Sequence, residues 1–137
     1  MSDHRITYIT APTEVAERIA TTLVEERLAM CVNIIERVTS IYRWEGQIDH
    51  ASESLLIVKG TAATTDALIA RVREIHPYEV PEVVSLDIVA GNPDYLDWLA
   101  GKEIVLEEAD LEDNADLENA EDESETENGQ EKEETEA

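Results

Sequence analysis

The stretch that decides the fold of this chain is residues 31–46, which read CVNIIERVTSIYRWEG. β-Branched and aromatic residues dominate it, and from Val38 onward successive side chains alternate as in a β-strand. Glu36 and Arg37 interrupt the apolar order, so we expect a bulge or bend there. Gly46 allows a turn, and residues 53–60, ESLLIVKG, form a second strand. The sequence therefore predicts a long hairpin in which residues 47–52 are a polar connection.

This hairpin is too long for a small domain to cover. A strand over residues 31–44 spans roughly 45 Å at about 3.3 Å per residue, whereas a domain of about 100 residues has a radius of gyration of about 13 Å. The hairpin must extend beyond the domain and expose strand edges and apolar side chains, which invite pairing with another chain. We therefore expect a homo-oligomer that associates through this arm.

The flanking segments complete a regular order of strands and helices. Residues 5–10 alternate as a strand, and apolar residues that recur at i and i+4 predict a helix over residues 13–29. Beyond the hairpin we expect a helix over residues 64–76, a strand over residues 81–90, and a short helix within residues 92–99. The order βαββαβ is typical of a split βαβ sandwich, so we predict an α+β, ferredoxin-like fold with a four-stranded antiparallel sheet and two helices on one face.

Charge divides the chain of 137 residues into two parts. Residues 1–102 hold 16 acidic and 9 basic residues and form the predicted domain, whereas residues 103–137 hold 17 acidic residues and one basic residue. We expect this tail to be disordered, as either a solvating segment or an interaction tail. The net charge of −23 argues against a nucleic-acid partner. Three lysines against seven arginines, with many acids, favour a halophilic source.

Other features narrow the class of protein. The N-terminus has no apolar run of signal-peptide length, and the longest apolar run, residues 55–58, is too short for a membrane span. A single cysteine excludes an internal disulfide, so we expect a cytoplasmic protein without a membrane partner. The five glycines are scattered and form no phosphate-binding loop, and no nucleophile lies beside a base. The sequence therefore predicts no enzymatic activity.

Residues 76–83, HPYEVPEV, contain the candidate metal ligands His76 and Glu82. Pro77 ends the helix before Glu82, so these two side chains and Cys31 can converge only through the tertiary fold. The alternative is that His76 caps a helix C-terminus, where an imidazole is favourable, while Cys31 is a small buried residue. Five aromatic residues are candidates for subunit-interface anchors or, alternatively, for a small-molecule pocket at a subunit cleft. They are Tyr42, Trp44, Tyr78, Tyr95 and Trp98.

Five ordered motifs together resemble the CutA family of divalent-cation tolerance proteins: TAPTEVAERIA, ERLAMCVNII, VTSIYRWEGQI, HPYEVPEV and GNPDYLDWL. The resemblance covers residues 5–100 and implies a ferredoxin-like protomer in a homotrimer with intersubunit strand pairing, similar in shape to the PII signal transducers. It implies a link to tolerance of copper and other divalent cations, and no enzymatic reaction. Many relatives have Pro-Gly in place of Glu36 and Arg37.

The resemblance also implies a copper site, built from a cysteine, a histidine and a glutamate. In this chain those three positions look like Ile9, Ile75 and Glu82, so only Glu82 has a ligand side chain. A divalent cation such as copper is therefore the expected cofactor, if there is one, and its binding is expected to be weak. Two alternatives stay open: a PII-like sensor with a metabolite at the subunit cleft near Tyr78 and Trp44, and a trimeric scaffold whose acidic tails recruit a partner.

Overall fold

The computed structural model describes residues 2–102 as one α+β unit. The predicted tail, residues 103–137, lies outside the described residues. The elements, in chain order, are β1 (His4–Ala11), α1 (Thr13–Glu25), β2 (Cys31–Trp44), β3 (Gln47–Thr61), a 3₁₀ turn (Ala62–Thr64), α2 (Thr65–Ile75), β4 (Val83–Asp87) and α3 (Pro93–Leu99). Within residues 2–102, no helix is long and apolar enough to cross a membrane.

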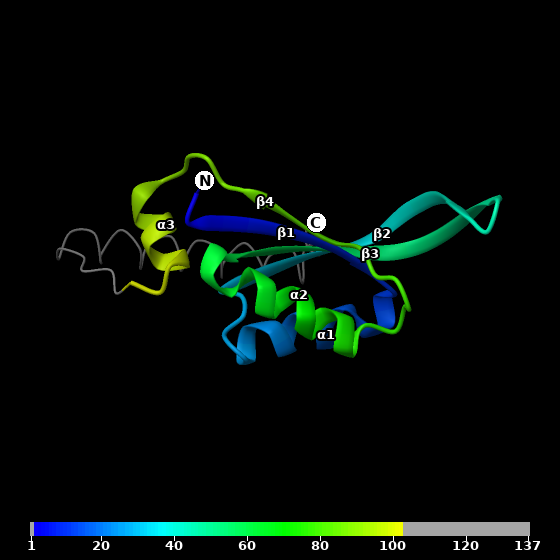
Figure 1. Cartoon of the computed structure of the whole chain (residues 1–137), viewed down its shortest axis with the longest axis horizontal. Helices are drawn as coiled ribbons and strands as arrows, with labels where there is room; N and C mark the ends of the chain where they lie inside the picture. The colour runs from blue at the N-terminus through cyan, green and yellow to red at the C-terminus, as the bar shows by residue number, and fades with distance from the viewer. Residues whose placement is uncertain (1, 103–137) are drawn as a thin grey trace, which may run out of the picture. The chain divides into compact units, whose positions relative to one another are not determined.

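The four strands form one sheet in the order β2-β3-β1-β4, and every neighbouring pair is antiparallel. Helices α1 and α2 both cover the same face of this sheet, whereas α3 lies at the end opposite the tip of the β2–β3 hairpin (Figure 1). This arrangement confirms the predicted ferredoxin-like α+β fold. The sheet face that α1 and α2 leave uncovered is called the open face below.

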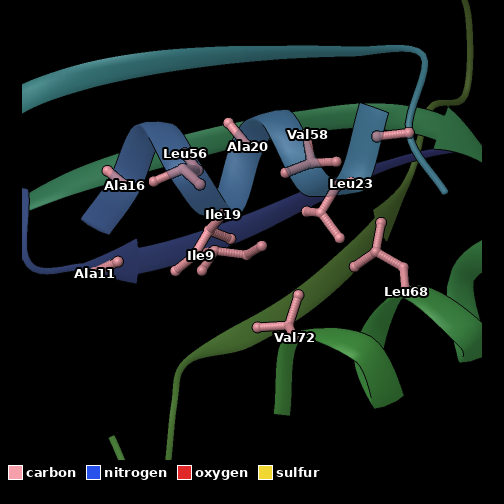
Figure 2. Packing of buried hydrophobic residues seen from close by; sticks show 11 residues of the cluster. Ile9, Ala11, Ala16, Ile19, Ala20, Leu23, Leu56, Val58, Leu68 and Val72 are labelled. Carbon is pink, nitrogen blue, oxygen red and sulfur yellow. The ribbon is translucent and has the colours of Figure 1, made fainter. Parts of the chain in front are cut away.

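The core lies between the two helices and the covered face. Ile9 of β1 and Leu56 of β3 are fully buried and point toward α1, where Ile19 and Leu23 meet them (Figure 2). Buried residues of α1 recur at the helical spacing expected for one packed face, and they are Ala16, Ile19, Ala20 and Leu23. Because side chains alternate along a strand, the neighbours of Ile9 and Leu56 point to the open face.

Helix α1 ends four residues before the predicted boundary. Arg27 has a φ of 62°, the left-handed conformation that usually requires glycine. The N–H of Leu28 donates to the carbonyl of Leu23 at 2.9 Å, and that of Arg27 donates to Val24 at 3.1 Å, which is the Schellman pattern of helix termination. The predicted end at residue 29 was wrong because the apolar pattern continues through Leu28, while the backbone has already turned at Arg27.

The hairpin follows the prediction in β2 and departs from it in β3. Residues 47–52 are strand rather than a polar connection. Glu45 and Gly46 have φ values of 51° and 81°, so a two-residue turn reverses the chain and Trp44 pairs directly with Gln47. The polarity of this segment is compatible with a strand because the arm is exposed on both faces. This arm, defined as residues 38–53, extends beyond the helices (Figure 1).

The expected bulge is present. The register shifts between Ile35, which pairs with Leu55, and Val38, which pairs with Glu53. Glu36 and Arg37 therefore lie opposite a single residue of β3, and Arg37 has a φ of 66°. Because the bulge adds one residue, Val38 points to the same face of the sheet as Ile35, although it lies three residues further along β2.

Strand β4 is shorter than predicted. It pairs with β1 from Val83, opposite Ile9, to Asp87, opposite Arg5. Since β1 begins at His4, few partners remain for the residues after Asp87, and only the N–H of Ile88 continues the ladder, to the carbonyl of His4 at 3.0 Å. The length of β4 is therefore limited by the length of its partner β1 rather than by the length of the apolar run in the sequence.

Candidate functional site

The segment between α2 and β4 is held by His76, which is 6% exposed. Its ring Nε2 lies 2.8 Å from the carbonyl oxygen of Thr10, and its Nδ1 accepts the N–H of Tyr78 at 3.1 Å. An amide N–H only donates, so Nδ1 is unprotonated and Nε2 carries the proton that it donates to Thr10. Metal binding by His76 stays a prediction, and it would require one of these two hydrogen bonds to break.

The sequence suggested that the imidazole of His76 caps the C-terminus of α2, but in the structure the backbone N–H of His76 makes the contact with the helix end. The backbone N–H of His76 donates to the carbonyl of Val72 at 2.8 Å and closes the last turn of α2. The imidazole itself reaches β1 instead of the helix end. His4, at the start of β1, is half-buried, and its Nε2 lies 2.9 Å from the carbonyl oxygen of Leu96 in α3.

Glu82, the remaining candidate ligand of this segment, is exposed and lies beside the end of β1. Its Oε1 accepts a hydrogen bond from the Thr10 hydroxyl at 3.2 Å. The two candidate ligands thus both hydrogen-bond to Thr10: His76 donates to its backbone carbonyl, and Glu82 accepts from its hydroxyl.

Sequence reasoning missed a fourth residue of this region, Glu53 of β3. It is 5% exposed, and its Oε2 accepts a hydrogen bond from the Tyr78 hydroxyl at 2.8 Å. Burial, and then the hydrogen bond and charge of Glu53, raise the pKa of Tyr78 to about 12. The Tyr78 hydroxyl is therefore a permanent donor near neutral pH. A signal was present in the sequence: Glu53 shares the strand face of Leu55 and Ile57, an unusual place for a carboxylate.

Glu53, Tyr78 and Glu82 line a cleft of about 660 Å³ whose lining continues along the arm to Asp49 and Trp44, and which is called the acidic cleft below. Its charged lining residues are all carboxylates: Asp49, Glu53, Glu79 and Glu82. Its aromatic lining residues are Tyr42, Trp44 and Tyr78. The structure thus brings three of the five aromatic candidates together.

The other two aromatic candidates lie elsewhere. Tyr95 and Trp98 both belong to α3, where their ring centroids are 5.6 Å apart. Helix α3 begins where the Asn92 side chain accepts the N–H of Asp94 at 3.0 Å, with Pro93 in the first turn. This pair forms a separate exposed aromatic surface rather than part of the acidic cleft.

Cys31, the third candidate ligand, is remote from His76 and Glu82. It is half-buried at the start of β2 and pairs with Lys59, which in turn pairs with Ile6 of β1. Thr10 is four residues further along β1, about 13 Å away at 3.3 Å per residue. The expectation that Cys31 is buried is thus met only in part. Cys31 and Glu82 of one protomer do not reach a common ion.

The copper site implied by the resemblance does not fit the side chains present. Ile9 is fully buried against the helices, on the face opposite to Thr10 and Glu82, and Ile75 packs against the same core. Among residues 2–102, no three His, Cys, Asp or Glu side chains converge closely enough to hold a metal ion. The geometry therefore offers a wide acidic cleft in place of a compact coordination site.

The topology, the bulged arm and the acidic cleft together define a ferredoxin-like α+β protein with its candidate site along an extended hairpin. Comparison with known proteins narrows this class. The profile described as "CutA1 divalent ion tolerance protein" matches residues 5–102. The chain belongs to this family.

Individual relatives agree with this assignment. The chain is 54% identical over 95 residues to the divalent-cation tolerance protein CutA of Thermus thermophilus, a match that covers 69% of this chain and 92% of the relative. It is 48% identical over 93 residues to Protein CutA of mouse, covering 67% of this chain but 52% of the relative, so it spans about half of that protein.

Solved structures give the same result. The Thermus thermophilus Cut A1 structure matches with a TM-score of 0.70 at 50% identity, covering 74% of this chain and 99% of the other. The structure titled periplasmic divalent cation tolerance protein CutA of Archaeoglobus fulgidus matches with a TM-score of 0.68 at 40% identity, covering 70% and 94%.

Proposed function

We propose that this chain acts in the cytoplasm as a non-enzymatic homotrimer in the tolerance of and response to divalent cations, copper among them. Membership of a family described by divalent ion tolerance supports the role. The absence of a His, Lys or Cys side chain from the lining of the acidic cleft, within residues 2–102, supports a binding rather than a catalytic site.

The observation that carries the trimer is the uncovered apolar surface. On the open face, Val84 and Leu86 are each 49% exposed and Ile35 is 48% exposed. On the arm, Ile41 and Ile48 are 64% and 63% exposed. Apolar side chains exposed on a sheet with free edges are stabilised when another copy covers them. The long arm supplies both edges and apolar side chains to a neighbouring subunit.

Native mass spectrometry of the full chain tests the assembly. We expect a trimer, and we expect Leu86→Glu to shift the population to monomers because it places a charge on the buried interface. Val24→Glu is the matched control, since Val24 is also exposed, at 42%, but lies on α1 outside the open face. A monomeric unmodified chain, or an equal effect of both variants, would refute the proposed interface.

Metal binding in this proposal is weak and electrostatic. Glu82 contributes a carboxylate at one wall of the acidic cleft, together with its acidic neighbours Glu79 and Glu53. Calorimetric titration of Cu²⁺ should give a smaller heat with Glu82→Ala than with the unmodified chain, while Glu17→Ala, an exposed acid on α1, should leave the heat unchanged. Equal heats for all three proteins would remove Glu82 from the site.

A second candidate function, a PII-like sensor of a small molecule, is favoured by one specific observation. The acidic cleft has a volume of about 660 Å³, within the range of small-molecule sites and far larger than a single ion needs. Trp44 lines it and reports occupancy by its fluorescence. A metabolite that changes this fluorescence should lose its effect with Trp44→Phe and retain it with Trp98→Phe, because Trp98 lies in α3.

A further inference from the structure

Lys59 of β3 lies within the surface that the proposed trimer covers. It pairs with Ile6 of β1, which pairs in turn with Leu86 of β4, so these three side chains form one row across the open face. Cys31 of β2 completes the row on the other side of Lys59. Lys59 is half-buried, and no ion pair within residues 2–102 includes it. The row thus combines one cation with apolar neighbours.

Covering this row with another copy would remove Lys59 from water. A buried ammonium group is stable only when a carboxylate or other acceptors pair with it. The carboxylates of β3 on the same side of the sheet are too far away in the same chain. Glu53 and Asp49 lie six and ten residues from Lys59, about 20 Å and about 33 Å along the strand. The neighbouring subunit therefore has to supply the acceptor.

The acidic cleft has the opposite requirement. Its four charged lining residues are all carboxylates, and its lining follows the arm, which the proposed trimer places against a neighbouring subunit. Carboxylates that are covered together repel one another unless a cation lies among them. In a homotrimer the covering surface has the same sequence as the arm. The cation is therefore one of the ten lysines and arginines of this chain.

Position and pairing select Lys59 among these ten. Three already have a carboxylate partner in the same chain: Arg5, Arg71 and Lys102. Three lie in or directly after the helices, which cover the other face of the sheet: Arg18, Arg27 and Arg73. Two belong to the bulge and the arm rather than to the sheet that the arm covers: Arg37 and Arg43. The last, Lys132, stands between two glutamates in the sequence.

We propose that, in the trimer, Lys59 of one subunit enters the acidic cleft of the next subunit and forms an ion pair with one of its exposed carboxylates, Asp49 or Glu82. A closed ring of three joins two different surfaces of the chain at every interface, and here those surfaces have opposite charge. The ion pair fixes the register in which the arm lies on the open face. This inference deepens the proposed homotrimer and rests on it.

Native mass spectrometry of the full chain over a dilution series tests the contribution of Lys59. Lys59→Glu places a negative charge against the acidic cleft, so the concentration at which the trimer dissociates should rise at least about tenfold. Lys59→Gln, which removes the charge without reversing it, should raise this concentration less and serves if Lys59→Glu fails to fold. Arg18→Glu is the matched control, since Arg18 is an exposed cation of α1, and it should leave the trimer unchanged.

Charge reversal on the other surface locates the partner of Lys59. Asp49→Lys or Glu82→Lys, each combined with Lys59→Glu, restores an ion pair of opposite orientation. The two groups cannot meet within one chain: Asp49 is about 33 Å away along β3, and Glu82 lies beside Thr10, about 13 Å along β1 from the partner of Lys59. One of the two double variants should therefore dissociate within a few-fold of the unmodified concentration, and only through contact between subunits.

The failure of this inference can be told apart from the failure of the trimer. If the unmodified chain is a trimer and Leu86→Glu dissociates it, but Lys59→Glu does not, the trimer stands and the ion pair is wrong. The ion pair is also wrong if neither double variant restores the assembly, or if Arg18→Glu weakens it as much as Lys59→Glu. A monomeric unmodified chain would overturn both.

Discussion

Replacement of His76 by leucine tests the role of this residue most directly. Leucine keeps an apolar side chain at a position that is 6% exposed, but it removes the hydrogen bond to the Thr10 carbonyl at 2.8 Å and the one from the Tyr78 N–H at 3.1 Å. A typical hydrogen bond contributes about 1 kcal/mol, and leaving a buried partner unsatisfied costs about 1–3 kcal/mol. The free energy of unfolding should therefore fall by about 2–4 kcal/mol.

Urea unfolding of the full chain at one fixed protein concentration measures this loss, because the stability of an oligomer depends on concentration. His50→Leu is the control: His50 is an exposed residue of the arm, so the change should stay within about 0.5 kcal/mol. Nitrogen-15 NMR of the unmodified protein should also show that His76 is protonated on Nε2. A loss below about 1 kcal/mol, or a proton on Nδ1, would refute the structural role argued for His76.

Three further predictions concern the backbone and the cleft. Arg27→Gly should raise the free energy of unfolding by about 0.5–1 kcal/mol because Arg27 has a φ of 62°. The control Arg18→Gly, within α1, should lower it by about 1 kcal/mol. Urea unfolding measures both, and a change of the same sign in the two variants would contradict the account of the helix end. Gly46→Ala should cost about 1 kcal/mol through its φ of 81° alone, since nothing lies within 4 Å of the added Cβ, while Gly60→Ala, which has ordinary contacts at 3.7 Å, should cost less. The pKa of Tyr78 is raised to about 12, so its protonated phenol stabilises the fold fully below pH 10, and this contribution is lost as the pH rises toward 12. The thermal unfolding temperature should therefore fall over that interval, and it should fall less steeply in Tyr78→Phe. Identical declines in the two proteins would exclude the phenol as the cause.

The sequence was most informative where one face of an element is apolar. The bounds of β2 were predicted correctly because alternation from Val38 to Trp44 reports the strand period directly, and the bulge was visible as two charged residues, Glu36 and Arg37, within it. The end of α1 was not predictable from this signal, since Arg27 adopts a glycine-like conformation without being glycine. Local backbone geometry decided this boundary, and the apolar pattern does not report it.

The site was predictable only in part for a related reason. Tyr78, Trp44 and Tyr42 were identified as candidates from their residue type, and the structure places all three at the acidic cleft. Glu53 was missed because its burial depends on Tyr78, which is 25 residues away in sequence and reaches it from a different element. The separation of Cys31 from Glu82 likewise follows from strand register, which the apolar pattern of a single strand does not specify.

The bulge has a consequence for how this chain tolerates changes in length. Before the bulge, odd-numbered residues of β2 such as Ile35 point to the open face; after it, even-numbered residues such as Tyr42 and Trp44 do so, because they pair with the odd-numbered residues of β3. Deletion of either Glu36 or Arg37 would leave one residue opposite Ser54, so Val38 would still pair with Glu53 and every later side chain of β2 would keep its side. A deletion between Val38 and Trp44 has no bulge to absorb it and would turn the later side chains of β2 to the opposite side, so the bulge is the point of this strand at which the loss of one residue is tolerated.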